Sequence, residues 1–246
     1  MAEPRSISQV GTSEPFELQV SRGQVGWHKT LFKYGYNPLI INVNETVWDG
    51  GGIYSYPASA LAMTVTSAGG ATDEDVQVMV IGLDGDWNEA QQEVTLDGSG
   101  TATTTQTFRR VFRAYVSGSQ APTGNITIAN GGTTYAQITL GENQTLMAVY
   151  TVPAGHTFYL TNGSATHGTG TSGGVFMTVR FMTREFGGVF RTATKIDIVE
   201  SEVLFPFTFP LRIPEKTDLE VRAICNKNQN NAVSATFEGV LIDSRT

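Results

Sequence analysis

The sequence predicts an all-β protein. Its antiparallel strands are expected to form a β-sandwich, jelly-roll-like or Ig-like in topology, preceded by an extended N-terminal segment. From Val76 onward, apolar and polar residues alternate in short runs that end at turn-forming residues, as they do in half-buried strands. No helical period of 3.6 residues continues for more than two turns. This alternation favours neither topology over the other.

The first strands are predicted between residues 76 and 161. Val76–Ile81 is expected at the centre of a sheet, because both of its faces are largely apolar. The next candidates are Glu93–Leu96, which ends at Asp97-Gly98, then Thr103–Val116, long enough to bend or bulge, and Asn125–Ala129, which ends at Asn130-Gly131-Gly132. Thr145–Val152 and His156–Thr161 predict a hairpin, since Pro153 and Gly155 supply the turn chemistry between them.

The remaining strands are predicted between residues 175 and 242. Val175–Arg184 and Phe190–Glu200 predict a second hairpin through Gly187-Gly188. Leu204–Ile213 contains two prolines and is followed by a third. It is expected at an edge or a crossover, because each proline removes a hydrogen-bond donor. Leu219–Cys225 and Val233–Ile242 are expected to form the last pair of strands.

The stretch 16–57 differs from the rest of the chain. It concentrates aromatic residues among polar residues and glycines, without an apolar period that would build a core. We therefore predict a docking segment at 1–57 and a sandwich domain at 58–246. The docking segment is expected to bind a partner through Trp27, Tyr34, Trp48 and Tyr54. The alternative is that Trp48 and Tyr54 pack onto the protein's own sheet.

Composition favours contact with other proteins over contact with nucleic acid or membrane. Charged residues make up only 16% of the chain, against about 25% in a typical soluble protein. The net charge is -7 and the basic residues are scattered, which argues against binding to a phosphate backbone. No stretch approaches the ~20 apolar residues of a membrane span, and the N-terminus lacks the apolar run of an export signal. Cys225, the single cysteine, is expected to be a small core residue on a strand.

One acidic turn partly matches a calcium-binding loop. Asp84, Asp86 and Asn88 occupy the first three ligand positions of such a loop. Glu89 and Thr95 then stand where the loop requires a glycine and a bidentate glutamate. We expect an ordinary turn between two strands, and no metal site is predicted.

No catalytic residue and no cofactor is predicted. His28, His156 and His167 lack metal-ligand spacing; His156 is expected to be half-exposed, and His167 to lie in a loop at Asn162–Gly174. Neither Gly98-Ser99-Gly100 nor Gly118-Ser119 fits a G-x-S-x-G turn, and the glycine runs 50–52 and 187–188 lack the lysine and the spacing of phosphate-binding loops. Trp87 and Tyr135 are expected as exposed aromatic residues that a sugar ring would stack on.

Three blocks of the sequence carry a resemblance to a known family. They read GQVGWHKTLFKYGYNP from Gly23, VWDGGGIYSYP from Val47 and VMVIGLDGDWNEAQQEVTLDG from Val78. With Ile213–Asp218 and Val233–Ala235, they resemble virion structural proteins of tailed bacteriophages, especially marine ones. The resemblance spans most of the chain. It implies assembly into a particle, without catalytic residues.

The sequence and the resemblance together predict a non-enzymatic virion component made in the host cytoplasm. We expect an accessory tail, neck or head-surface protein that forms homo-oligomers and binds other virion proteins through its N-terminal segment. Capsid decoration is an alternative within the same class. A second alternative is a module that binds a receptor or host-surface glycan, through Trp87 and the loop Asn162–Gly174. A hydrolase acting on a surface polymer is the third.

Overall fold

The computed structural model describes residues 14–168, 175–199, 202–228 and 230–244. These residues form an all-β fold of sixteen strands in antiparallel sheets, together with a short α-helix and a one-turn 3-10 helix. The predicted fold class is confirmed. In the described ranges, no helix is long and apolar enough to cross a membrane.

The helix α1 covers Phe16–Ser21, and the 3-10 helix η2 covers Gly70–Asp73. The first nine strands are β1 (His28–Ile40), β2 (Glu45–Thr46), β3 (Leu61–Ser67), β4 (Gln77–Leu83), β5 (Glu89–Thr95), β6 (Thr101–Phe108), β7 (Arg110–Val116), β8 (Ile126–Asn130) and β9 (Thr133–Ile138). The last seven are β10 (Val149–Thr151), β11 (His156–His167), β12 (Met177–Arg184), β13 (Arg191–Ile198), β14 (Glu202–Ile213), β15 (Asp218–Cys225) and β16 (Asn231–Asp243).

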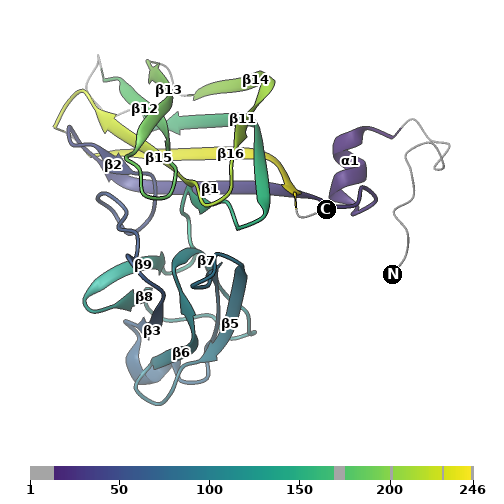
Figure 1. The fold of residues 1–246 in the computed structure, drawn as a ribbon. Coiled ribbons are helices and arrows are strands. Elements are labelled where there is room, and N and C mark those ends of the chain that lie inside the picture. The colour runs from purple at the N-terminus through teal and green to yellow at the C-terminus, as the bar shows by residue number, and fades with distance from the viewer. Residues whose placement is uncertain (1–13, 169–174, 200–201, 229, 245–246) are drawn as a thin grey trace.

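The strands build two sandwiches, one inserted into the other (Figure 1). Strands β1, β2 and β10–β16 form the terminal sandwich, whose sheets have the orders β1-β16-β11-β14 and β10-β15-β12-β13, with β2 beside β15. Strands β3–β9 form the inserted sandwich, with the orders β6-β3-β8-β9 and β5-β4-β7. In Figure 1 the inserted sandwich lies below the terminal one. The helix α1 lies beyond the N-terminal end of β1.

Each sandwich has its own apolar core. In the terminal sandwich, the buried ring of Phe237 on β16 meets the ring of Phe181 on the facing sheet, with 5.4 Å between centroids. In the inserted sandwich, Val78 and Val80 on β4 are fully buried. Val76 just before the strand is also fully buried, as the alternation of this strand predicts. Cys225 is buried on β15, which confirms its predicted place in a core.

Buried charged side chains connect the two sandwiches. Arg110 of β7 donates from Nε and Nη2 to the two carboxylate oxygens of Asp218 on β15, at 2.7 and 3.1 Å. The Nζ of Lys33 on β1 donates to the backbone carbonyl of Phe112 on β7. Burial lowers the pKa of Lys33 to about 7, because the ammonium group loses its hydration. The junction is therefore a specific polar contact between residues far apart in sequence.

The predicted boundary between residues 57 and 58 is corrected by the structure. β1 pairs with β16 from His28↔Ile242 to Ile40↔Asn231, so much of the expected docking segment is a strand of the terminal sandwich. β2 pairs with β15 in the facing sheet. Removal of residues 1–57 would therefore delete two strands. The sequence hides this because β1 buries only part of one face and therefore shows no strong apolar period.

One predicted hairpin and the predicted last pair of strands are wrong. β10 and β11 are joined by the turn at 153–155, but β10 pairs with β15, whereas β11 pairs with β14 and β16. In the same way β15 and β16 lie in facing sheets. Alternation indicates that a strand buries one face. It does not tell whether the next strand lies beside it or across the core.

Other strand predictions are confirmed. β12 and β13 form the hairpin predicted through Gly187-Gly188. The proline-containing β14 is the last strand of its sheet, at an edge. The long segment 103–116 divides at Arg109 into β6 and β7, which belong to different sheets.

Candidate functional site

The structure separates the four predicted partner-binding residues into two pairs. Trp48 and Tyr54 are 3% and 2% exposed, and their rings meet edge to face at 5.3 Å in the core of the inserted sandwich. Trp48 Nε1 donates to the Gly52 carbonyl, and the Tyr54 hydroxyl donates to the Val111 carbonyl. Their prediction as exposed anchors is therefore corrected. The apolar contacts and the hydrogen bonds of both side chains are made within the protein itself.

Trp27 and Tyr34 lie on the surface. Trp27 is 59% exposed just before β1, and its carbonyl accepts a hydrogen bond from the Asp243 amide. Tyr34 is 38% exposed on β1, opposite Thr236 of β16. Six residues of extended strand separate the two side chains along the chain, so they do not form a single cluster. Their role in binding a partner stays a prediction.

The residues predicted to form a glycan platform are buried. Trp87 lies in the core of the terminal sandwich, and Tyr135 lies in that of the inserted sandwich. The loop expected at Asn162–Gly174 begins as part of β11, which continues to a buried His167. Residues 169–174 of that loop lie outside the described ranges. His156 is also buried, where a half-exposed side chain was expected.

The acidic turn at Asp84 is stabilised by its own backbone. Asp84 Oδ1 accepts hydrogen bonds from the amides of Asp86 and Asn88, both at 2.9 Å. Such a pattern is an Asx-type turn, which satisfies the carboxylate locally. Among the described residues, no group of three or more His, Cys, Asp and Glu side chains is placed to hold a metal ion.

The most distinctive surface feature is the side of the terminal sandwich where β13 and β14 end the two sheets. We call this side, with the connecting turn at 185–190, the β13–β14 rim. Neither strand has a second hydrogen-bonded neighbour within the described ranges. Unpaired edges of this kind offer free main-chain donors and acceptors to another strand.

Within the described residues, the other ends of the sheets contact strands of a neighbouring sheet. In the inserted sandwich β5 contacts β6 and β7 contacts β9, so its two sheets approach each other along both sides. At the opposite end of the terminal sandwich, β10 contacts β7, and Lys29 of β1 forms an ion pair with Glu89 of β5 at 2.8 Å. The β13–β14 rim is thus the side on which the terminal sandwich stays open.

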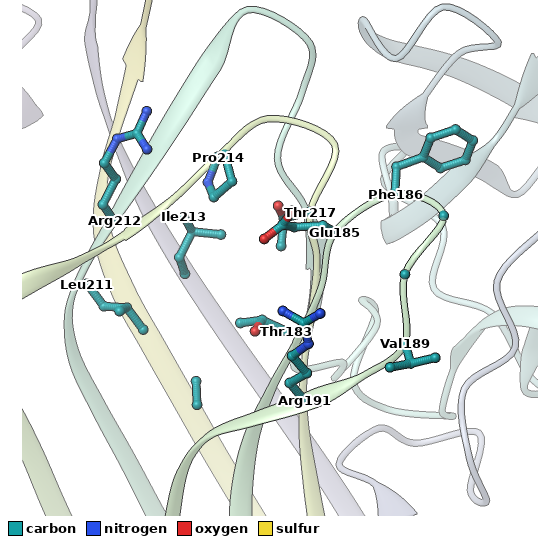
Figure 2. Close-up of a pocket in the computed structure, with 13 residues that line it drawn as sticks. Thr183, Glu185, Phe186, Val189, Arg191, Leu211, Arg212, Ile213, Pro214 and Thr217 are labelled. Carbon is teal, nitrogen blue, oxygen red and sulfur yellow. The ribbon is translucent and has the colours of Figure 1, made fainter.

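A hollow of about 390 Å³ lies along the rim. Figure 2 shows Leu211 and Ile213 of β14 on one side of it and Arg191 of β13 on the other, with Phe186 and Val189 on the adjoining turn. Mixed apolar and cationic lining of this kind suits a protein surface better than a fully apolar ligand.

Large apolar side chains are exposed along and beside the rim. Phe209 of β14 is 87% exposed, and the other members of this group are Phe186, Val189, Val199 and Leu204. Single exposed apolar residues are common on protein surfaces, whereas several of them beside an unpaired strand edge indicate a contact surface. The alternation in the sequence predicted these strands, but it carried no signal that they would lie at the open side.

The two edges of the rim differ in their capacity to pair. β14 contains Pro206 and Pro210, which cannot donate to a neighbouring strand. β13 contains no proline, and after an irregularity near Thr192 it continues regularly from Thr194 to Ile198. β13 is therefore the edge that is open to main-chain pairing, and β14 supplies apolar side chains beside it.

Comparison with known proteins gives weak similarities. No family model matches the sequence, and no curated protein matches it. Among solved structures, the chain is similar to infectious bursal disease virus Gt strain, at 13% identity and a TM-score of 0.27, covering 94% of this chain and 78% of that one. It is also similar to T=1 particles derived from the virus, at 14% identity and a TM-score of 0.26, covering 88% and 70%. A third similarity is to the VP2 subviral particle, at 12% identity and a TM-score of 0.25, covering 88% and 73%. At these TM-scores the likeness carries no argument about function.

Proposed function

We propose that the protein is a non-enzymatic structural component of a tailed bacteriophage virion, an accessory protein of the tail, neck or head surface. It associates with a second copy of itself through the β13–β14 rim. The observation that supports this proposal is the rim itself, where the β13 edge has no second strand neighbour in the described part of the chain and lies beside exposed apolar side chains. The resemblance of the sequence to virion proteins supports assembly into a phage particle.

The charges of β13 suit pairing with a copy of the same strand. In an antiparallel pair centred on Ile196, Lys195 of each copy lies opposite Asp197 of the other. Both side chains are exposed, and both belong to the regular part of the strand. Opposite charges directly across an antiparallel pair stabilise it by roughly 0.2–1 kcal/mol. A two-fold axis through Ile196 would join the two five-stranded sheets into one and repeat each contact twice.

Charge reversal at β13 tests this contact. Lys195→Asp places two carboxylates opposite each other at both ends of the pair, so we expect the dimer to dissociate at least several-fold more readily. The double variant Lys195→Asp/Asp197→Lys exchanges the charges and should restore association. Light scattering of the full chain across a concentration series measures both effects. A monomer at all concentrations, or equal association in every variant, would refute the dimer.

Assembly into a particle is tested separately. Particles purified from the phage that encodes the chain should contain the protein at a fixed number of copies, measured by quantitative mass spectrometry. Trp27→Ser and Tyr34→Ser then test the second predicted contact, with other virion proteins, because both rings lie on the surface. Absence of the protein from purified particles would contradict the virion role, whatever its state of association in solution.

A further inference from the structure

A second hollow lies at the junction of the two sandwiches, and it shares only the β12–β13 turn with the β13–β14 rim. This junction pocket has a volume of about 450 Å³. Its walls come from the connection at 53–58, from the start of β7, from the β12–β13 turn and from β15. A ligand in it would therefore touch both sandwiches at once.

The pocket is cationic in an acidic protein. Four arginines line it, namely Arg109, Arg110, Arg184 and Arg222. Asp218 binds Arg110 and Arg184, and Glu220 binds Arg222, so four arginines share two carboxylates. The local excess of positive charge contrasts with the net charge of -7 for the chain, which has only 16 lysines and arginines. Such a concentration of one sign in a recess favours an anion.

Much of the donor capacity in the pocket is unused. Arg110 is occupied by Asp218 and by the carbonyls of Pro57 and Arg109. By contrast, Arg109 Nε is buried without a hydrogen-bond partner in the described part of the chain. Within the described residues, Arg222 donates a hydrogen bond only from Nε, to Glu220. The Nη atoms of Arg222 are therefore available to a ligand that enters the pocket.

Aromatic rings hold these guanidinium groups in place. Arg109 lies over the ring of Trp87 at 5.0 Å. Arg184 lies over Tyr56 at 4.5 Å and over Phe190 at 4.4 Å, and Arg222 lies over Phe190 at 4.6 Å. Stacking of this kind fixes the plane of a guanidinium and leaves its edge free to donate. The donors are thus oriented before any ligand arrives.

We propose that the junction pocket binds a small oxyanion, a phosphate or a carboxylate, between Arg109 and Arg222. A planar guanidinium donates two parallel hydrogen bonds to a phosphate or to a carboxylate, so the same arginines recognise both groups. Phe186, Phe190 and Tyr56 beside the arginines give room and apolar contact for the body of an organic anion. Since the ligand contacts both sandwiches, its binding stabilises the folded chain.

The test measures thermal unfolding of the full chain with inorganic phosphate and with glucuronate, the two sources of the oxyanion. Glucose serves as the uncharged control and sodium chloride as the control for ionic strength. We expect a saturable rise in Tm with at least one of the anions, with a dissociation constant below about 1 mM, and none with the controls. Preference between the two probes assigns the ligand to the phosphate or the carboxylate class. No saturable effect of either anion overturns the proposal.

Substitutions locate the site. Arg109→Gln and Arg222→Gln should each weaken binding at least about tenfold, whereas Arg113→Gln, an exposed arginine outside the pocket, should not. If Arg222→Gln does not fold, Arg222→Lys replaces it in the binding test. This variant keeps the positive charge but loses the paired donors of the guanidinium. Equal binding by all variants would show an adventitious interaction elsewhere and refute the assignment. Because association is measured independently by light scattering, failure of this proposal and failure of the proposed dimer are distinguishable.

Discussion

Asp218 provides the sharpest test of how the two sandwiches are held together. Its buried carboxylate accepts two hydrogen bonds from Arg110 and two from Arg184, at 2.6–3.1 Å, and a fifth from the Thr151 hydroxyl at 2.7 Å. Asp218→Asn keeps the shape and removes the charge. It leaves Arg110, which is also buried, without a counter-ion.

The expected loss of stability is large. Removal of one partner from a buried ion pair typically costs about 3–5 kcal/mol, because the remaining charge stays desolvated. Arg184 is partly exposed and regains hydration, so the loss derives mainly from Arg110. Against a typical free energy of unfolding of roughly 5–15 kcal/mol, a change of this size is easily measured.

The assay is urea unfolding at neutral pH, followed by tryptophan fluorescence and circular dichroism. Asp86→Asn is the matched control, since Asp86 is exposed in a turn, and it should change the free energy of unfolding by less than about 0.5 kcal/mol. The double variant Arg110→Met/Asp218→Asn should recover part of the loss, because the buried charge is then absent. A loss below about 1 kcal/mol for Asp218→Asn would refute the reasoning.

Three further predictions concern pH, packing and close approach. Burial raises the pKa of Asp49 to about 7, so stability should fall as pH rises from about 4 to 7, by at most ~1.4 kcal/mol per pH unit; Asp49→Asn should lack this slope in urea titrations. Phe237→Ala should cost about 3–5 kcal/mol, seen as a lower urea midpoint, because it removes a fully buried ring between the sheets. Gly35→Ala should lower Tm, because a Cβ there would meet the backbone of Val47 and Ala148, whereas Gly85→Ala, where the Cβ makes an ordinary contact, should not.

Local patterns predicted much of the fold but little of the candidate site. The alternation in 76–81 identified a central strand, and the prolines of 204–213 placed another strand at an edge. The same reasoning treated the aromatic residues of 16–57 as one surface, although Trp48 and Tyr54 are core residues and Trp27 and Tyr34 are exposed. Aromatic rings suit a core and an interface equally well, so residue type alone could not separate them.

The sequence by itself determined the all-β class, the β12–β13 hairpin and the core position of Cys225. These depend on the period of two and on turn residues, which are local properties of the chain. Only the tertiary structure decided that β1 pairs with β16, that strands β3–β9 form an inserted sandwich, and that β13 and β14 lie at the edges of their sheets. It also brought together the four arginines of the junction pocket from β7, β12, β15 and the residue before β7. Strand partners and charge clusters arise from contacts between distant residues, and alternation along one strand contains no information about which distant strand it will meet.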